Sequence, residues 1–328
     1  MGNTASDKVL IVGAGAVGQV YGLHMQRGGA SVAVFVKDKY AEAARQGYTL
    51  HRVRRAATRF VPDTVVSDAA GVEEQGPWDQ VWLCMSSTAL QGWKEAGAVL
   101  RAAGPRATVL CLTTGIEDVE FVSAKIGGLD RLVEGLITMI SWHAPLPGQQ
   151  VDPAGVAYWL PPGAAPPFSG DATRVGRLVT TLKKGGYRAK VVKSVRTRNA
   201  FGAATLLPLM AGLEMAAWSF KTFRKGRWLG VATRAGREGH AIAASRLGVR
   251  HAKWLSAIAL NPTIVGFIAW IAPWFVPFPL ETYLKEHFTK VGDQTRSHLR
   301  RYLELAEEHT LPCVGLRELR EGLGDDVG

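Results

Sequence analysis

Cysteine is scarce in this chain of 328 residues, which contains only Cys84, Cys111 and Cys313. Three thiols cannot build a disulfide framework, and the first two lie in apolar runs. We therefore expect buried, reduced thiols and a cytoplasmic location. We also expect no secretory leader, because residues 1–7 are polar and too short to supply its apolar segment.

Acidic residues are in short supply, with 28 Asp and Glu against 39 Lys and Arg, which gives a net charge of +11. A nucleic-acid reader would concentrate such an excess in a patch or a recognisable module. Here the basic residues are scattered, and the densest local group is residues 52–55. We expect no nucleic-acid partner and no metal site, but a surface that attracts anionic small molecules.

The most apolar stretch, residues 259–279, is interrupted by Gly266 and four prolines. A membrane-spanning helix needs about 20 continuous apolar residues, so this stretch is not expected to span. We expect it in the core or at the interface of a homodimer; weak peripheral membrane contact beside the basic residues 221–237 is the alternative. The leader, with Gly2 and Ser6, also fits the N-myristoylation pattern, although an ordinary disordered leader is the interpretation that we favour.

The stretch that organises the chain is residues 8–39. An apolar run at residues 9–12 predicts a buried strand, a helical segment follows, and a second apolar run at residues 31–36 closes a βαβ unit of about 30 residues. Between the first strand and the helix stands the pattern G-x-G-x-x-G, formed by Gly13, Gly15, Ala16, Val17 and Gly18. Its glycines allow a tight turn, close approach of the backbone to a pyrophosphate and close helix–strand packing. The helix N-terminus offers N–H groups to the phosphates, so the pattern predicts a dinucleotide site.

The end of the second strand discriminates between the two nicotinamide dinucleotides. An acid there bonds the ribose 2′-hydroxyl of NAD, whereas a basic residue accommodates the 2′-phosphate of NADP. Lys37 stands where the polar tip of the strand is expected, and Lys39 is close enough to help. A one-residue error in the strand end would place Asp38 there instead. The sequence favours NADP(H).

The remaining pattern predicts an α/β fold, with a Rossmann-type dinucleotide-binding domain over residues 1–193 and an all-α substrate or dimerisation domain over residues 194–328. The first domain is expected to contain a helix at 40–46, a hairpin within 48–63, strands at 81–85, 108–112, 136–142, 158–160 and 187–192, a loop at 161–170 and a helix at 171–184. The second is expected to contain helical segments within 198–217, 221–237, 240–259 and 285–308.

Hydroxyl side chains follow two of these strands, at Ser86 and Thr114. Open α/β sheets bind ligands beyond the carboxyl ends of their strands, so both residues are candidates to lie near the nicotinamide. Either could equally cap a helix. His143 is a weaker candidate for acid–base chemistry, because a lone histidine beside a proline-rich turn is more often structural.

The opening residues 8–18, with Tyr21 and Gly22 just after them, resemble the ketopantoate reductase family. The order of the later parts extends the resemblance: a Thr-Gly pair at 114–115, the turn at 142–148, the segment 199–211 and residues 290–296. The resemblance implies NADPH-dependent reduction of a 2-oxo acid between a Rossmann domain and an all-helical domain.

Four positions depart from that family. The residue nine before Pro208, where the family has its catalytic lysine, is Asn199. Gln294 replaces the substrate-binding glutamate, Thr114 an asparagine and Ser86 a lysine. An asparagine amide can donate a hydrogen bond to a carbonyl but delivers no proton. The site suits a substrate other than ketopantoate.

Two hypotheses of function follow. The first is an NADP-dependent oxidoreductase acting on CH–OH or C=O groups, with a 2-oxo acid-like, ketone or imine substrate oriented by Asn199 and Gln294. Its proton would come from water, His143 or Lys290. The second is an NADP(H)-binding sensor or partner-binding protein that has lost catalysis, which the missing lysine would favour.

Overall fold

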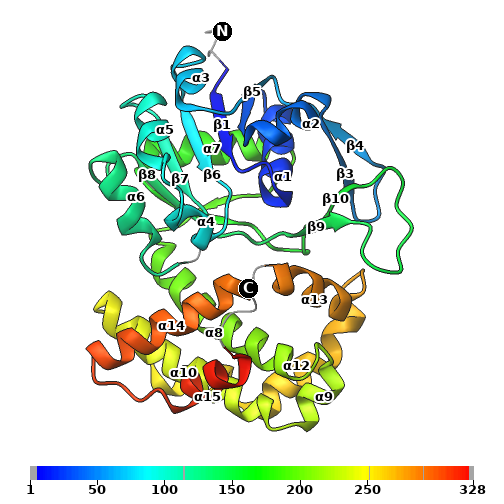
Figure 1. The fold of residues 1–328 in the computed structure, drawn as a ribbon, viewed down its shortest axis with the longest axis vertical. Helices are drawn as coiled ribbons and strands as arrows, with labels where there is room; N and C mark the ends of the chain where they lie inside the picture. Colours follow the sequence, from blue (N-terminus) through cyan, green and yellow to red (C-terminus); the bar gives the residue numbers. More distant parts are fainter. Residues whose placement is uncertain (1–5, 114, 251, 291, 325–328) are drawn as a thin grey trace. The chain divides into compact units, whose positions relative to one another are not determined.

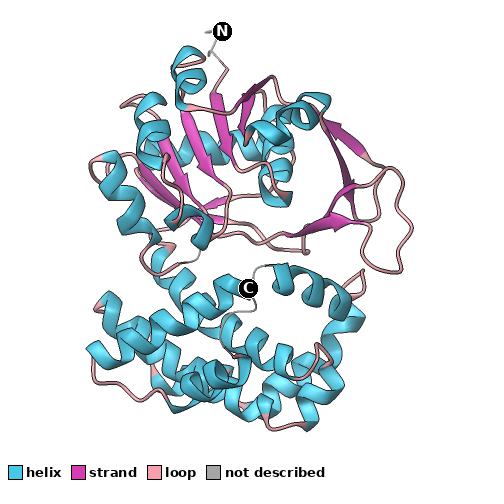
Figure 2. Ribbon diagram, viewed as in Figure 1, coloured by secondary structure: helices cyan, strands magenta, loops and turns pink. Residues whose placement is uncertain are grey.

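The chain folds into two compact units, Met1–Arg196 and Thr197–Gly328. The computed structural model describes residues 6–113, 115–250, 252–290 and 292–324. Unit 1 combines strands and helices, whereas the described part of unit 2 is helical throughout (Figures 1 and 2). The chain is therefore the mixed α/β protein that the sequence predicts, with its sheets confined to the N-terminal unit.

Unit 1 is built on a sheet of order β12-β11-β8-β7-β6-β1-β2-β5, in which the strands from β8 to β5 run parallel. Its elements are β1 (Lys8–Val12), α1 (Ala16–Arg27), β2 (Ser31–Phe35), η1 (Asp38–Tyr40), α2 (Ala41–Gln46), β3 (Tyr48–Arg52), β4 (Thr58–Phe60), β5 (Thr64–Val66), α3 (Ala69–Glu74), β6 (Gln80–Leu83), α4 (Ser87–Gln91), α5 (Ala96–Ala102), β7 (Thr108–Cys111), α6 (Asp118–Ile126), β8 (Leu132–Gly135), β9 (Ile140–Ala144), β10 (Gly155–Trp159), β11 (Pro167–Gly170), α7 (Ala172–Lys184) and β12 (Lys190–Val191).

The sheet has a hydrophobic core on each face, which is why its central strands are apolar beyond their first residue. Along β1, Val9 and Ile11 pack into one core, which also holds residues of α1 and α7. Leu10 and Val12 pack into the other, with residues of α3, α5 and α6. All four side chains are almost completely buried. A parallel sheet covered on both faces requires such continuous apolar runs.

The predicted βαβ unit is confirmed, since β1 and β2 pair in parallel with Val12 opposite Phe35. The predicted hairpin is also present, as β3 and β4 pair antiparallel. These two strands continue into a second sheet of order β4-β3-β10-β9.

Two predictions in unit 1 are wrong. Residues 136–142 do not form one strand: β8 ends at Gly135 in the main sheet, and β9 begins at Ile140 in the second sheet. The first part of this apolar run is the connection between β8 and β9, which belong to different sheets. Residues 161–170 are not a loop throughout, because Pro167–Gly170 forms β11 and pairs antiparallel with β8. The predicted last strand is shorter than expected and consists of Lys190–Val191.

Unit 2 contains α8 (Arg196–Met215), α9 (Phe220–Lys225), α10 (Trp228–Leu247), α11 (Lys253–Ala259), α12 (Pro262–Phe275), α13 (Leu280–Lys290), α14 (Gly292–Glu308) and α15 (Val314–Leu323). The expected helical segment 240–259 is interrupted, because α10 ends at Leu247 and Gly248 follows in the left-handed conformation. Residues 285–308 also belong to two helices rather than one.

The expectation that residues 259–279 lie in a core is wrong for the outer face of α12. Phe267, Trp270 and Trp274 are among its exposed side chains, whereas Val265 and Ala269 are buried. Among the described residues, no single helix is long and apolar enough to cross a membrane. Only α11 and α12 taken together reach the length and composition of a span, with a bend of 41° between them.

Candidate dinucleotide site

The glycine-rich loop leaves the sheet where its strand order reverses. From β1 the chain continues to β2 and β5 on one side, and later to β6, β7 and β8 on the other. Gly13 has φ of +94°, and a Cβ added there would lie 2.7 Å from the carbonyl oxygen of Cys84, just beyond β6. Only glycine fits this turn. The loop thus lies at the topological switch point, where doubly wound sheets bind their ligands.

Gly15 leaves open space in front of the N-terminus of α1. It is the N-cap residue of the helix, with φ of −74° and ψ of −172°, and it supplies no side-chain cap. A Cβ at Gly15 would meet no atom within 4 Å. Ala16, Val17 and Gly18 form the first turn, whose N–H groups have no partners within the helix. No acidic residue lies in that turn, so the positive end of the helix dipole is unopposed by a nearby carboxylate.

Two contacts fix the shape of the loop. A Cβ on Gly18 would lie 2.1 Å from the carbonyl oxygen of Gly13, so the helix and the turn touch at this glycine. Gln19, which is buried, donates from Nε2 to the carbonyl oxygen of Ala14 at 2.8 Å. The sequence analysis missed the role of Gln19, although its place directly after the third glycine could have suggested it.

Lys37 and Lys39 lie in the segment that follows β2. The strand ends at Phe35, Val36 is buried, and Lys37 is the first exposed residue, where it caps the short helix η1. Lys39 is exposed in η1, with Nζ 4.9 Å from the ring centre of Tyr40. The observed end of β2 therefore places a cation before Asp38 as the chain leaves the sheet.

A buried carboxylate organises the loops that follow β6 and β7. Asp118, 1% exposed, accepts from Ser87 Oγ and Gln91 Nε2 at 2.8 Å each through Oδ1, and from the Gly115 N–H at 2.8 Å through Oδ2. It thereby ties α4 and the loop after β7 to the start of α6. The sequence analysis missed Asp118, because its side-chain partners stand 27 and 31 residues earlier in the chain.

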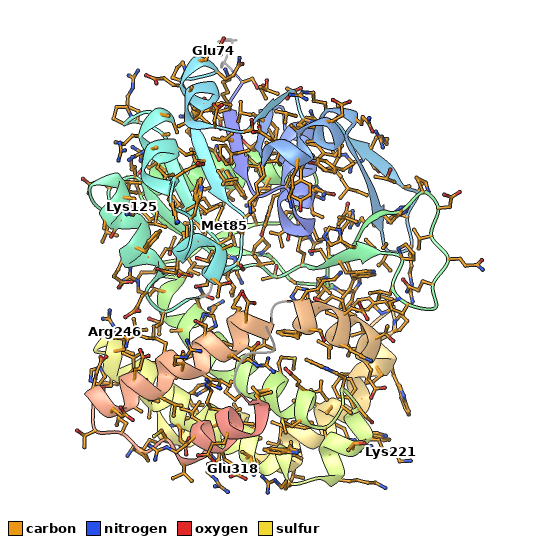
Figure 3. All side chains as sticks on the ribbon, viewed as in Figure 1. Glu74, Met85, Lys125, Lys221, Arg246 and Glu318 are labelled. Atoms are coloured by element: carbon orange, nitrogen blue, oxygen red, sulfur yellow. The ribbon has the colours of Figure 1, made fainter. Side chains whose placement is uncertain are left out.

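Ser86 caps α4, which is the capping role that the sequence left open for it beside a place near the nicotinamide. Its Oγ accepts from the Ala89 N–H at 3.2 Å and lies 3.1 Å from Thr88 Oγ1. Met85, labelled in Figure 3, precedes it in the loop after β6. Thr114 lies outside the described residues, but its neighbour Gly115 is constrained, because a Cβ there would come within 2.3 Å of Ser87 Oγ.

Several titratable groups near the loop are too deeply buried for proton transfer at neutral pH. Desolvation raises the pKa of Cys111 to about 11 and also raises that of Cys84, so both thiols stay protonated, as the sequence predicts for buried cysteines. His24, on the inner face of α1, is stacked with Tyr187 and has Nδ1 2.7 Å from the carbonyl oxygen of Gly185. Burial lowers the pKa of His24 to about 4, which keeps the ring neutral. His143, in contrast, is exposed on β9.

Asn199 lies near the N-terminal end of α8 and Gln294 near the N-terminal end of α14, both in unit 2. Helices α8 and α14 run antiparallel: Tyr302 Oη lies 3.4 Å from the Ala200 carbonyl oxygen, while Arg296 pairs with Glu214 at 2.9 Å. Asn199 therefore lies beside the second half of α14, and Gln294 beside the far end of α8. From residue 199 to residue 214 an α-helix rises roughly 20 Å. The structure does not bring these two side chains together.

No group of three or more histidine, cysteine or acidic side chains among the described residues could hold a metal ion. The loop at Gly15, in contrast, has features that suit a dinucleotide pyrophosphate: open space at Gly15, a helix N-terminus without a side-chain cap and no acidic residue in the first turn of α1. The geometry of unit 1 therefore fits a dinucleotide.

Comparison with known proteins agrees with this geometry. The family model of ketopantoate reductase PanE/ApbA matches residues 9–151. A PanE/ApbA family ketopantoate reductase from Ralstonia eutropha JMP134 has a TM-score of 0.74 at 18% identity, over 96% of each chain. The 2-dehydropantoate 2-reductase from Methylococcus capsulatus has a TM-score of 0.67 at 16% identity, over 96% of this chain and 95% of that one.

A further similar structure is that of D-mandelate dehydrogenase with NADH and anilino(oxo)acetate, which has a TM-score of 0.68 at 15% identity over 96% and 97% of the two chains. A search of curated protein sequences finds no match. Residues 9–151 match the ketopantoate reductase PanE/ApbA family model, in agreement with the resemblance seen in the sequence, and the chain has the fold of the solved ketopantoate reductases.

Proposed function

We propose that this protein is an NADP(H)-dependent oxidoreductase that reduces a carbonyl substrate, a 2-oxo acid-like compound or a ketone or imine, other than ketopantoate. The observation that carries the proposal is the open glycine turn at the N-terminus of α1, at the switch point of a sheet whose residues match a reductase family. Similar structures include a 2-dehydropantoate 2-reductase and a D-mandelate dehydrogenase, which supports a 2-oxo or 2-hydroxy acid as the first substrate class to test.

The preference for NADP(H) rests on Lys37. An exposed cation at the end of β2 can pair with a 2′-phosphate, and Lys39 adds a second cation two residues later. Asp38 follows Lys37 on η1 and is exposed, so it does not take the position at the strand end. Gly13, Gly15, Ala16, Val17 and Gly18 would hold the pyrophosphate, since their backbone surrounds the open space at the helix N-terminus.

In this proposal the reduced nicotinamide supplies the hydride to the carbonyl carbon, and the developing alkoxide oxygen must gain a proton. Asn199, half-buried in α8, can donate an amide hydrogen bond to that oxygen but cannot transfer a proton. Ser86 and Thr114 follow neighbouring parallel strands and would line the nicotinamide end. The proton would come from water, His143 or Lys290, whereas His24 is excluded as a donor because burial keeps its ring neutral.

Gln294 lies beside the opposite end of α8 from Asn199, so the two residues need separate tests. Substitution of each residue by alanine separates their contributions. Asn199→Ala is expected to lower kcat by about tenfold or more, as one transition-state hydrogen bond is lost. If Gln294→Ala leaves both kcat and KM unchanged, Gln294 does not take part.

The test of the function is a titration of the protein with NADPH and NADH, followed by NADPH oxidation against ketopantoate, aryl and alkyl 2-oxo acids, ketones and imines. We expect tighter binding of NADPH and turnover of a member of the panel other than ketopantoate. Lys37→Glu should weaken NADPH binding about tenfold and leave NADH binding unchanged, since only NADPH carries the 2′-phosphate. Lys184→Glu, with the same charge change at an exposed position of α7, is the control.

The outcomes distinguish the alternatives. Turnover of ketopantoate at the highest rate in the panel would contradict the proposed substrate. Tight NADPH binding without turnover of any member would support the second hypothesis, a non-catalytic NADP(H)-binding protein. Absence of dinucleotide binding would refute the site itself.

A further inference from the structure

Helix α12 has its apolar side turned outward. The residues that it buries against unit 2 include Val265, Gly266 and Ala269, which are mostly small. The outward side carries large apolar residues, and α11, the preceding helix, also exposes large apolar side chains. We call this surface the aromatic face and define it by Trp254, Phe267, Ile268, Trp270, Trp274 and Phe275, which are 44–75% exposed.

The aromatic face is large for the surface of a soluble unit. Aromatic side chains offer about 150–250 Å² each, so the five aromatic residues of the face together expose about 600 Å². The largest apolar patch of a typical monomer is about 300–600 Å², including all its residues. Residues 254–280 also contain no Asp, Glu, Lys or Arg. Such a surface is expected to bind an apolar partner.

Cations border the aromatic face along α9. Lys221 and Lys225 are exposed in α9, and Lys221 is labelled in Figure 3, where its side chain extends outward from the helix. Arg227, just after α9, is also exposed but pairs with Glu318 at 3.2 Å. Arg224 joins Phe267 and Trp270 in lining a surface groove of about 350 Å³ between α9 and α12. The Nε atom of Arg224 is buried and has no hydrogen-bond partner among the described residues. The groove therefore offers a cation beside an aromatic wall.

We propose that the aromatic face binds the surface of a membrane that contains anionic lipids. Tryptophan and phenylalanine side chains insert at the boundary of headgroups and acyl chains, and lysine and arginine beside them attract anionic headgroups. We expect α11 and α12 to lie in the headgroup region and not to cross the bilayer, because they have only 7 and 14 residues and are bent by 41° relative to each other. The groove at Arg224 receives the phosphate of one lipid.

A second copy of the chain fits the same face less well. In a two-fold contact the same patch of both subunits meets, so the cations of both α9 helices would enter one interface. Like charges at an interface oppose association. An anionic lipid surface, in contrast, complements the aromatic residues and the cations together.

The test is co-sedimentation of the full chain with vesicles of phosphatidylcholine that contain about one third phosphatidylserine, compared with vesicles of phosphatidylcholine alone. We expect binding to the anionic vesicles and at least about tenfold weaker binding to the neutral ones. Trp274→Ser with Phe275→Ser should reduce binding about tenfold or more, because two side chains that are each 75% exposed leave the interface. Val314→Ser, at a 63% exposed position of α15, is the control for removing exposed apolar surface.

A second pair of variants tests the cations. Lys221→Glu with Lys225→Glu should weaken binding to anionic vesicles, whereas Lys183→Glu with Lys184→Glu changes the net charge equally on α7 and should not. Thermal unfolding followed by circular dichroism verifies that each variant is folded.

Three outcomes would overturn the proposal. One is the absence of vesicle binding by the wild-type chain. Another is binding that the substitutions at Trp274 and Phe275 leave unchanged. The third is a dimer in sedimentation equilibrium that these substitutions dissociate while vesicles bind no protein, which would assign the aromatic face to a second copy. None of these measurements depends on the proposed enzymatic activity.

Discussion

Gly15 and Gly18 lie three residues apart in the glycine-rich loop, but a methyl group would meet different surroundings at each. At Gly15 an added Cβ has no neighbour within 4 Å, and φ and ψ lie in the extended region that alanine readily adopts. We expect Gly15→Ala to change the free energy of unfolding by no more than about 1 kcal/mol. The methyl group would instead occupy the space assigned to the pyrophosphate. Loss of one charge-assisted hydrogen bond, about 1.5–3 kcal/mol, would weaken NADPH binding roughly 10- to 100-fold.

At Gly18 an added Cβ would lie 2.1 Å from the carbonyl oxygen of Gly13 and 3.0 Å from Ile11 Cγ2. Because a backbone oxygen cannot move aside as a flexible side chain can, the turn itself must shift. We expect Gly18→Ala to lower the free energy of unfolding by about 2–3 kcal/mol.

The assays are urea unfolding and fluorescence titration with NADPH, applied to both variants and to Gly176→Ala. Gly176 lies in α7 and also has no neighbour within 4 Å of an added Cβ, so it controls for a harmless methyl group. NADPH affinity within about twofold of wild type in Gly15→Ala would refute the pyrophosphate site. Wild-type stability in Gly18→Ala would refute the close packing of helix and turn.

Three further predictions concern other residues. Burial lowers the pKa of His24 from 6.5 to about 4, so the stability that depends on the neutral ring is complete above pH 6.5 and is lost as the pH falls towards 4. Between about pH 7 and pH 5 the free energy of unfolding should fall by about 2 kcal/mol. In His24→Phe this pH-dependent loss should be absent when urea unfolding is measured at the two pH values. Asp118→Asn should lower the free energy of unfolding by about 1–3 kcal/mol, because an amide cannot accept from all three of its donors, and unchanged stability would show that Asp118 does not hold the loops together. Asn199→Lys alone is expected not to create ketopantoate reduction, since Gln294 also differs from the family; strong activity in an NADPH oxidation assay would show that the scaffold needs only the lysine.

The parts of the fold that the sequence predicted correctly are those determined by local patterns. The glycine spacing and two apolar runs define β1, α1 and β2, and Asp171 at the start of α7 is an N-cap that accepts from the Arg174 N–H. The errors occur where tertiary context decides. Residues 136–142 contain the connection from β8 in the main sheet to β9 in the second sheet. No local sequence signal marks the point where the chain leaves one sheet for the other.

The candidate site shows the same division. The sequence could nominate Gly15 and Lys37, since the roles predicted for them depend on neighbours in the chain, and those roles stay predictions. It could not identify Asp118 as the common acceptor of two loops, because pairing across 27 and 31 residues leaves no periodic signal. Nor could it show that Gln294 lies beside the opposite end of α8 from Asn199, because this depends on the antiparallel packing of α8 and α14. For residues 259–279 it left a core, a dimer interface and membrane contact open, because composition alone does not say which side of a helix faces outward.

The carboxylate of Asp118 has a consequence for how the protein could acquire a new substrate. Since one side chain holds both α4 and the loop after β7, a change in the first turn of α6 would reposition both of these elements of the proposed site at once. Directed evolution for another substrate would then enrich substitutions in α6, a helix that contributes none of the predicted cofactor or catalytic residues.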